Sequence, residues 1–179
     1  MARRGTATGA RGHRRLLLLC GLAALAVAAA GAFDVAAATP PRALGASSGC
    51  RDGRLPDRRC TPGAAFAVGA RTVCVPGYAG RARDVPASEK RAVYAEYGIF
   101  SHRRGQYEVD HLIPLELGGS NSIANLWPQP ALPRPGFHEK DRLENTLHDL
   151  VCSGQMSLGR AQRAIATDWV SAFYRYVRS

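Results

Sequence analysis

The sequence predicts an α+β domain in which a short pair of strands is followed by two amphipathic helices. Residues 106–112 alternate between polar and apolar side chains, as a half-buried strand does. A Gly-Gly turn at 118–119 and a short apolar return at 123–127 supply the partner strand. Two later segments, 136–151 and 158–173, repeat apolar residues at helical spacing.

The first 38 residues have the pattern of a secretory signal peptide. Five Arg precede an apolar run at 16–30, and an Ala triplet at 36–38 offers an A-x-A cleavage site. The run is short for a membrane span, although an uncleaved N-terminal anchor is the alternative. We therefore expect an exported protein, periplasmic or secreted, with no stable membrane association after cleavage. Residues 39–49 are rich in Pro, Ala, Gly and Ser and are expected to form a flexible leader.

The chain is basic, with 24 Lys and Arg against 14 Asp and Glu, a net charge of +10. Loss of residues 1–38 removes five Arg and one Asp and leaves +6. A positive surface favours a polyanionic partner such as nucleic acid. Charge alone equally suits an ordinary basic protein, so it does not identify the partner.

Four cysteines follow the signal segment, and an even number in an exported chain predicts two disulfides. Three pairings are possible. A local Cys50–Cys60 loop and a long Cys74–Cys152 bridge are favoured. No C-x-x-C pair is present, which argues against a zinc ribbon. We expect residues 50–85 to form a Cys-rich and Gly-rich loop region that packs on the domain, with a short strand near 71–75.

Residues 86–179 are expected to form the functional domain. A helix is predicted from Pro86 to Tyr97, before the strands described above. Pro128, Pro130, Pro133 and Pro135 argue against regular structure between the second strand and the next helix. That helix ends near Cys152, and Ser157 is a suitable N-cap for the last one. The predicted apolar stripes consist of Leu143, Leu147, Leu150 and Val151, and of Leu158, Ala161, Ile165, Trp169 and Ala172 or Phe173.

Asp110 and His111 are adjacent at the end of the first strand, before Pro114. Phosphodiester hydrolysis needs a base that titrates near neutral pH, and His is the side chain suited to this. It also needs a cation near the scissile phosphate, which a carboxylate can hold. Neighbouring strand residues point to opposite faces, so both can serve one site only where the strand bends.

The run Asp-His-x-x-Pro-Leu-x-x-Gly-Gly, followed by Asn125-Leu126, resembles the motif of the HNH (His-Asn-His) endonucleases of the ββα-metal superfamily. The resemblance covers roughly residues 107–145. More loosely, residues 61–170 are similar to small exported bacterial proteins of this kind. It implies a disulfide-stabilised α+β fold, built on a ββα-metal finger with flanking helices and a motif core at 107–150.

The resemblance also implies roles for individual residues. Asp110 would bind the metal, His111 would activate water, and Asn125 would hold the loop and the base. His138 is the best match to the second metal ligand, although a longer Pro-rich gap precedes it and a solvated first-turn histidine is the alternative. One divalent ion is implied, Mg²⁺ first, with Mn²⁺, Ni²⁺ or Zn²⁺ as alternatives.

Side chains around the motif have weaker assignments. Arg142 and Asn145 lie about one and two helical turns beyond His138 and either contact phosphate or form a solvated face. His148 is expected at the surface. Trp127 is expected to be a core anchor rather than a base-stacking platform.

Taken together, the sequence predicts an exported metal-dependent endonuclease that cuts DNA, rather than RNA, with low sequence specificity. No separate recognition motif is visible, so phosphate contacts would dominate binding. One alternative is a non-catalytic exported nucleic-acid-binding module that keeps the scaffold. Another is an envelope protein whose His and Asp bind only a structural metal.

Overall fold

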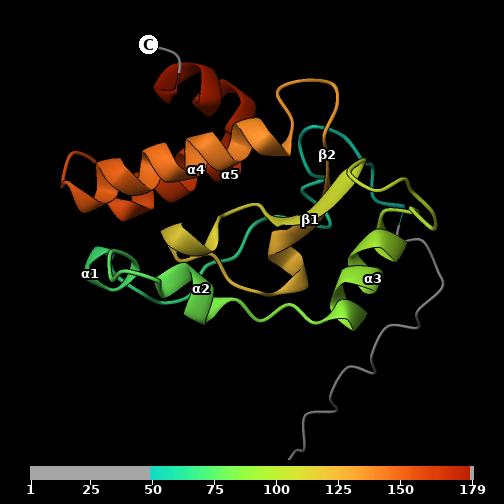
Figure 1. Cartoon of the computed structure of the whole chain (residues 1–179), viewed down its shortest axis with the longest axis horizontal. Helices are drawn as coiled ribbons and strands as arrows, with labels where there is room; N and C mark the ends of the chain where they lie inside the picture. The colour runs from blue at the N-terminus through green and yellow to red at the C-terminus, as the bar shows by residue number, and fades with distance from the viewer. Residues whose placement is uncertain (1–48, 178–179) are drawn as a thin grey trace, which may run out of the picture. The chain divides into compact units, whose positions relative to one another are not determined.

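The structure, a computed structural model, describes residues 49–177. The predicted signal peptide and nearly all of the predicted leader lie outside this range. The elements follow one another along the chain as shown in Figure 1. They are α1 (Ala70–Val73), α2 (Tyr78–Ala82), α3 (Ala87–Glu96), β1 (Tyr107–His111), the 3₁₀ turns η1 (Leu115–Leu117) and η2 (Ile123–Asn125), β2 (Leu126–Pro130), α4 (Phe137–Cys152) and α5 (Leu158–Tyr176).

The two strands form an antiparallel sheet in which Tyr107 pairs with Pro130 and His111 pairs with Leu126. The first strand lies where the sequence predicts it. The second begins later, because residues 123–125 form η2 instead.

The prediction that Pro128 and Pro130 prevent regular structure is wrong, since both lie within β2. The backbone N–H of Ala131 donates to the carbonyl of Gln106 on the β1 side. Donors alternate in direction along an antiparallel strand, so positions 128 and 130 face away from β1. Proline is tolerated there because no N–H is needed.

The strand predicted near 71–75 is also wrong, because α1 occupies this segment. The backbone N–H of Thr72 donates to Gly69, and that of Cys74 donates to Ala70. These local bonds satisfy the backbone without a neighbouring strand. The loop region 50–85 therefore contains two short helices.

Helices α4 and α5 lie side by side (Figure 1) and supply half of the residues of the buried hydrophobic core. The predicted stripes are confirmed, with Leu150 and Leu158 only partly buried at their edges. Trp127 is fully buried, as expected of a core anchor. One member of the buried face of α4 is not apolar: Lys140 is 0 % exposed.

The structure forms the two disulfides that the sequence favours, Cys50–Cys60 and Cys74–Cys152. The second ties the C-terminal end of α4 to the residue that follows α1. Both are compatible with an oxidising, extracellular environment. Among residues 49–177, no helix is long and apolar enough to cross a membrane.

Candidate active site

The connection between β1 and β2 is organised around Asn125, which is 0 % exposed. Its amide donates to the carbonyls of Ile113 and Ser120, both at 2.9 Å. Its oxygen accepts from the backbone N–H of Ile113 at 2.9 Å and from that of Ala64 at 3.3 Å. Every polar group of this buried side chain is satisfied, so Asn125 fixes the shape of the loop that follows His111.

Gly119 allows this loop to close tightly. A Cβ at this position would lie 1.7 Å from the carbonyl oxygen of Ile113. The second glycine of the motif is therefore required by the close approach of two backbone segments.

The ring of His111 is held by a different asparagine, Asn121. His111 Nε2 lies 3.1 Å from Asn121 Oδ1, and the Asn121 amide donates to the carbonyl of Ala82 at 2.8 Å. Because that donation turns the Asn121 oxygen toward the ring, Nε2 is the nitrogen that carries the proton in neutral His111. Nδ1 then keeps its lone pair and is the nitrogen able to accept a proton.

The environment of His111 favours the neutral ring. The residue is 2 % exposed, and burial lowers the pKa of its imidazole. The hydrogen bond to Asn121 and the charge of Asp110 raise this pKa, while Arg83 and Lys140 lower it further. A ring with a lowered pKa is unprotonated at neutral pH, which a general base requires.

Lys140, on the first turn of α4, joins the helix to both motif residues. Its ammonium donates to Asp110 Oδ2 and to the carbonyl of His111, both at 2.7 Å, and also to Glu144 Oε1. An ammonium has three donors, and here each has an acceptor. We call Lys140, Glu144 and Asp110 the charge clamp.

The charges of the clamp depend on one another. Burial opposes the charged form of Lys140, but Asp110 and Glu144 outweigh it and raise the pKa of the ammonium. Burial raises the pKa of Glu144, against the effect of Lys140. The lysine therefore stays protonated and holds the Asp110 carboxylate in one orientation.

His138 is exposed at the start of α4, and its ring packs on Phe137 with centroids 4.4 Å apart. Among residues 49–177, no hydrogen bond or ion pair joins it to Asp110 or His111. An electrostatic link runs through Asp141, whose pKa is raised by burial and by Asp110 and lowered by Lys140 and His138. Asp141, which sequence reasoning missed, is thus a carboxylate that interacts electrostatically with both predicted metal ligands.

The two predicted phosphate contacts do not face this cluster. The guanidinium of Arg142 lies over the Phe173 ring of α5, 5.7 Å from its centroid. The amide of Asn145 donates to the carbonyl of Asp141 on its own helix. An arginine that does act on the cluster is Arg83, exposed just after α2, since its charge is among those that lower the pKa of His111.

Lys140 and Glu144 are functional candidates that sequence reasoning missed, although a signal was present. Lys140 precedes Leu143 and Leu147 by three and seven residues and so falls on the apolar face of α4. Glu144 follows it by one helical turn, the spacing of an ion pair. A charge on an apolar face with a partner one turn away indicates a buried pair. Asn121 had no comparable local signal.

The donor chemistry around Asp110 fits a hard divalent ion held mainly by one carboxylate. A carboxylate offers about four lone-pair sites. Lys140 and the backbone N–H of His111 occupy two of those of Asp110. Its side chain is 15 % exposed, so the remaining sites are accessible. Mg²⁺ commonly uses one or two carboxylates and completes its shell with water and phosphate.

In the part of the chain that the structure describes, Asp110 and His138 belong to no group of three or more ligand-type side chains that could share one ion. The group that does meet this condition is Cys74, His148 and Cys152. Comparisons with protein-family models, with curated proteins and with solved structures find no match for this chain.

Proposed function

We propose that this protein is an exported metal-dependent endonuclease that hydrolyses phosphodiester bonds of DNA, built on a ββα-metal finger formed by β1, β2 and α4. The observation that carries the proposal is the fixed pair of Asp110 and His111. Asn121 binds the His111 ring, Lys140 binds the Asp110 carboxylate, and Asn125 fixes the backbone just after the pair, at Ile113. A carboxylate beside a neutral imidazole, both oriented by buried partners, is suited to hydrolysis.

His111 is the general base in this proposal. Asn121 keeps the proton on Nε2, so Nδ1 takes the proton of the attacking water. Lys140 accepts no proton, because its ammonium is fully buried and bound by three oxygens. Its role is to keep Asp110 and the main chain of His111 in place.

Asp110 would hold the divalent ion, with His138 and Asp141 as the α4 residues able to approach it. The ion would neutralise charge on the scissile phosphate and the leaving oxygen. Mg²⁺ suits the oxygen donors, and Mn²⁺, Ni²⁺ or Zn²⁺ would be accepted where His138 takes part. Arg83, an exposed cation whose charge acts on His111, would bind the phosphate, whereas Arg142 lies over Phe173.

The substrate of this proposal is DNA with low sequence specificity. Residues 49–177 contain only short helices and one two-stranded sheet outside α4 and α5, and these offer no second domain for reading bases. Binding would then rest on phosphate contacts and weaken as salt rises.

A plasmid-nicking assay on the oxidised protein from Thr39 onward tests the proposal, with each of the four metals and with EDTA. His111→Ala should lower the cutting rate about 10²- to 10⁴-fold, the usual contribution of a general base. His102→Ala is the matched control, because His102 is exposed and packs on Tyr94 outside the cluster. It should cut at the native rate.

Because His111 is buried, His111→Gln is measured beside it, and far-UV circular dichroism checks that both variants fold. Loss of cutting in both folded variants, but not in His102→Ala, supports the proposal. A folded native protein that cuts nothing with any metal, or a His111→Ala variant that cuts at the native rate, contradicts it. Retained DNA binding without cutting would favour the non-catalytic binding module.

A further inference from the structure

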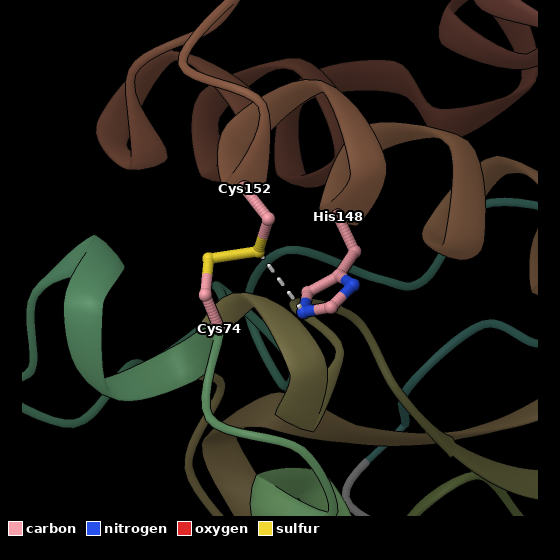
Figure 2. A group of neighbouring side chains, drawn as sticks. All are labelled: Cys74, His148 and Cys152. Atoms are coloured by element: carbon pink, nitrogen blue, oxygen red, sulfur yellow. Dashed lines mark hydrogen bonds between the residues drawn. A yellow bond between two sulfur atoms is a disulfide. The ribbon is translucent and has the colours of Figure 1, made fainter.

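A second chemical cluster lies at the opposite end of α4 from the charge clamp. Figure 2 shows Cys74, His148 and Cys152 converging, with the two sulfur atoms joined in a disulfide. One ligand-type atom of each residue lies within 4.8 Å of the others. We call these residues the Cys-His-Cys group.

Two members of the group are fixed by the geometry of α4. His148 and Cys152 are one helical turn apart and therefore lie on the same face. His148 Nε2 lies 3.4 Å from Cys152 Sγ and 3.2 Å from the carbonyl oxygen of Val73. His148 is thus partly buried against α1, not at the surface as the sequence suggested.

The third member comes from a segment far away in the sequence. Cys74 is the C-cap residue of α1, and 78 positions separate it from Cys152. The approach of Cys74 to the two α4 residues is not local, and it brings two sulfurs and one imidazole together.

The oxidised group is not itself a metal site, because the ligand form of cysteine is the thiolate. A dithiol can convert it. Two electrons and two protons pass from the dithiol to the protein, the Cys74–Cys152 bond breaks, and the dithiol becomes a disulfide. Cys152 is exposed, so a reductant can reach one of the two sulfurs.

We propose that the reduced Cys-His-Cys group binds one Zn²⁺ through Cys74 Sγ, Cys152 Sγ and His148 Nε2, with a fourth position open to water. Two thiolates and an imidazole are a donor set that zinc prefers. Binding releases the two thiol protons. The His148 proton moves from Nε2 to Nδ1, and the bond to the Val73 carbonyl is given up.

The surroundings agree with a bound cation. Glu116, on η1, has a pKa that burial raises and that His148 lowers, which places its carboxylate within electrostatic range of the group. The three donors also sit where the disulfide joins α4 to the end of α1. The metal would therefore make the same connection in the reduced protein that the disulfide makes in the oxidised one. This proposal is independent of nuclease activity.

Cobalt binding tests the proposal with a direct spectroscopic signal. The full-length chain carries Cys20→Ser, Cys50→Ser and Cys60→Ser, so that only the cysteines of the group remain. It is reduced with dithiothreitol, desalted without oxygen and titrated with Co²⁺. We expect one Co²⁺ per chain with thiolate-to-metal charge-transfer absorption, displaced by Zn²⁺. His148→Ala in the same background should weaken binding by at least about 100-fold, more than loss of an outer partner usually costs.

A second measurement keeps the proposal open to refutation if His148→Ala folds poorly. Zn²⁺ should raise the melting temperature of the reduced chain more than that of the oxidised chain, in which the Cys-His-Cys group offers no thiolate. His148→Gln and Asn145→Ala, the latter an exposed α4 control, are compared in the same titration. The proposal is overturned if the reduced chain takes up no Co²⁺ or if the oxidised chain takes up as much. It is also overturned if both His148 variants bind Co²⁺ as tightly as the parent chain does.

Discussion

The two ends of α4 are attached to the rest of the domain by opposite kinds of chemistry. At the first turn, Lys140 binds Asp110, which lies 30 positions earlier in the chain. At the last turn, Cys152 is bonded to Cys74. A disulfide stabilises mainly by restricting the unfolded chain. Buried charges must first be desolvated, and apolar residues of similar volume often stabilise as well or better. The charged end therefore needs a reason other than stability, and the proposed function supplies one, since Lys140 holds the Asp110 carboxylate and the backbone of His111.

The largest effect on stability is expected from Lys140→Met. The substitution keeps most of the side-chain volume but leaves Asp110 and Glu144 without their cation. Removal of one partner from a buried ion pair costs about 3–5 kcal/mol. Urea unfolding measures the change. Lys90→Met on α3 is the matched control and should change the free energy of unfolding by less than about 0.5 kcal/mol. A loss below about 1 kcal/mol in Lys140→Met would mean that the clamp is not formed.

The disulfide end is tested by removing each bridge in turn as a pair of Cys→Ser substitutions. Loss of Cys74–Cys152, with its separation of 78, should cost about 4 kcal/mol in the loop-entropy model. Loss of Cys50–Cys60, with a separation of 10, should cost about 3 kcal/mol in the same model. Equal costs, or the reverse order, would mean that strain or residual structure in the unfolded chain outweighs loop length.

Glu116 interacts electrostatically with both ends of α4, through Lys140 and His148, and gives the smallest effect. Burial raises the pKa of Glu116 above its ordinary value of 4.5. The folded state therefore binds this proton more tightly than the unfolded state does. The resulting stabilisation is complete below pH 4.5 and is lost as pH rises through the folded pKa.

In Glu116→Gln the side chain does not ionise, so the pH dependence that comes from Glu116 is absent. At pH 7 the variant should be more stable than the native chain, and the difference should shrink toward pH 4.5. Thermal melts across this range measure it, with exposed Asp84→Asn as the control. A variant that is less stable at pH 7 would mean that the Glu116 carboxylate is stabilised by its cationic neighbours.

Local patterns account for the part of the fold that the sequence predicted. The apolar stripes of α4 and α5 follow from helical periodicity, and β1 follows from alternation. The short segment at 71–75 was assigned wrongly because five residues carry little periodic signal and a strand needs a partner. Pro128 and Pro130 were judged by residue type alone, whereas their tolerance depends on which N–H groups face β1.

The candidate site also contains residues that a local motif predicts and residues that only the folded structure reveals. Asp110, His111 and Asn125 follow from a local motif, and the structure places the first two at the end of β1 and Asn125 in η2, just before β2. Asn121 binds the His111 ring from ten positions away, and Arg83 acts on it electrostatically from the segment after α2. No local pattern reveals either interaction. Sequence patterns do not point to the charge clamp at once, because lysine side chains are normally exposed to solvent. The position of Lys140 on the apolar face of α4 is the sequence feature that indicates its burial.

The most direct test of the account compares stability and cutting in Lys140→Met combined with Glu144→Gln. This double variant removes one positive and one negative charge, so it should recover part of the stability that Lys140→Met loses. Asp110 then has no ammonium to orient it. We expect cutting of plasmid DNA to fall about 10- to 100-fold although the protein is folded, as loss of an outer partner of a metal ligand does. A folded double variant that cuts at the native rate would contradict the claim that the charge clamp serves the active site.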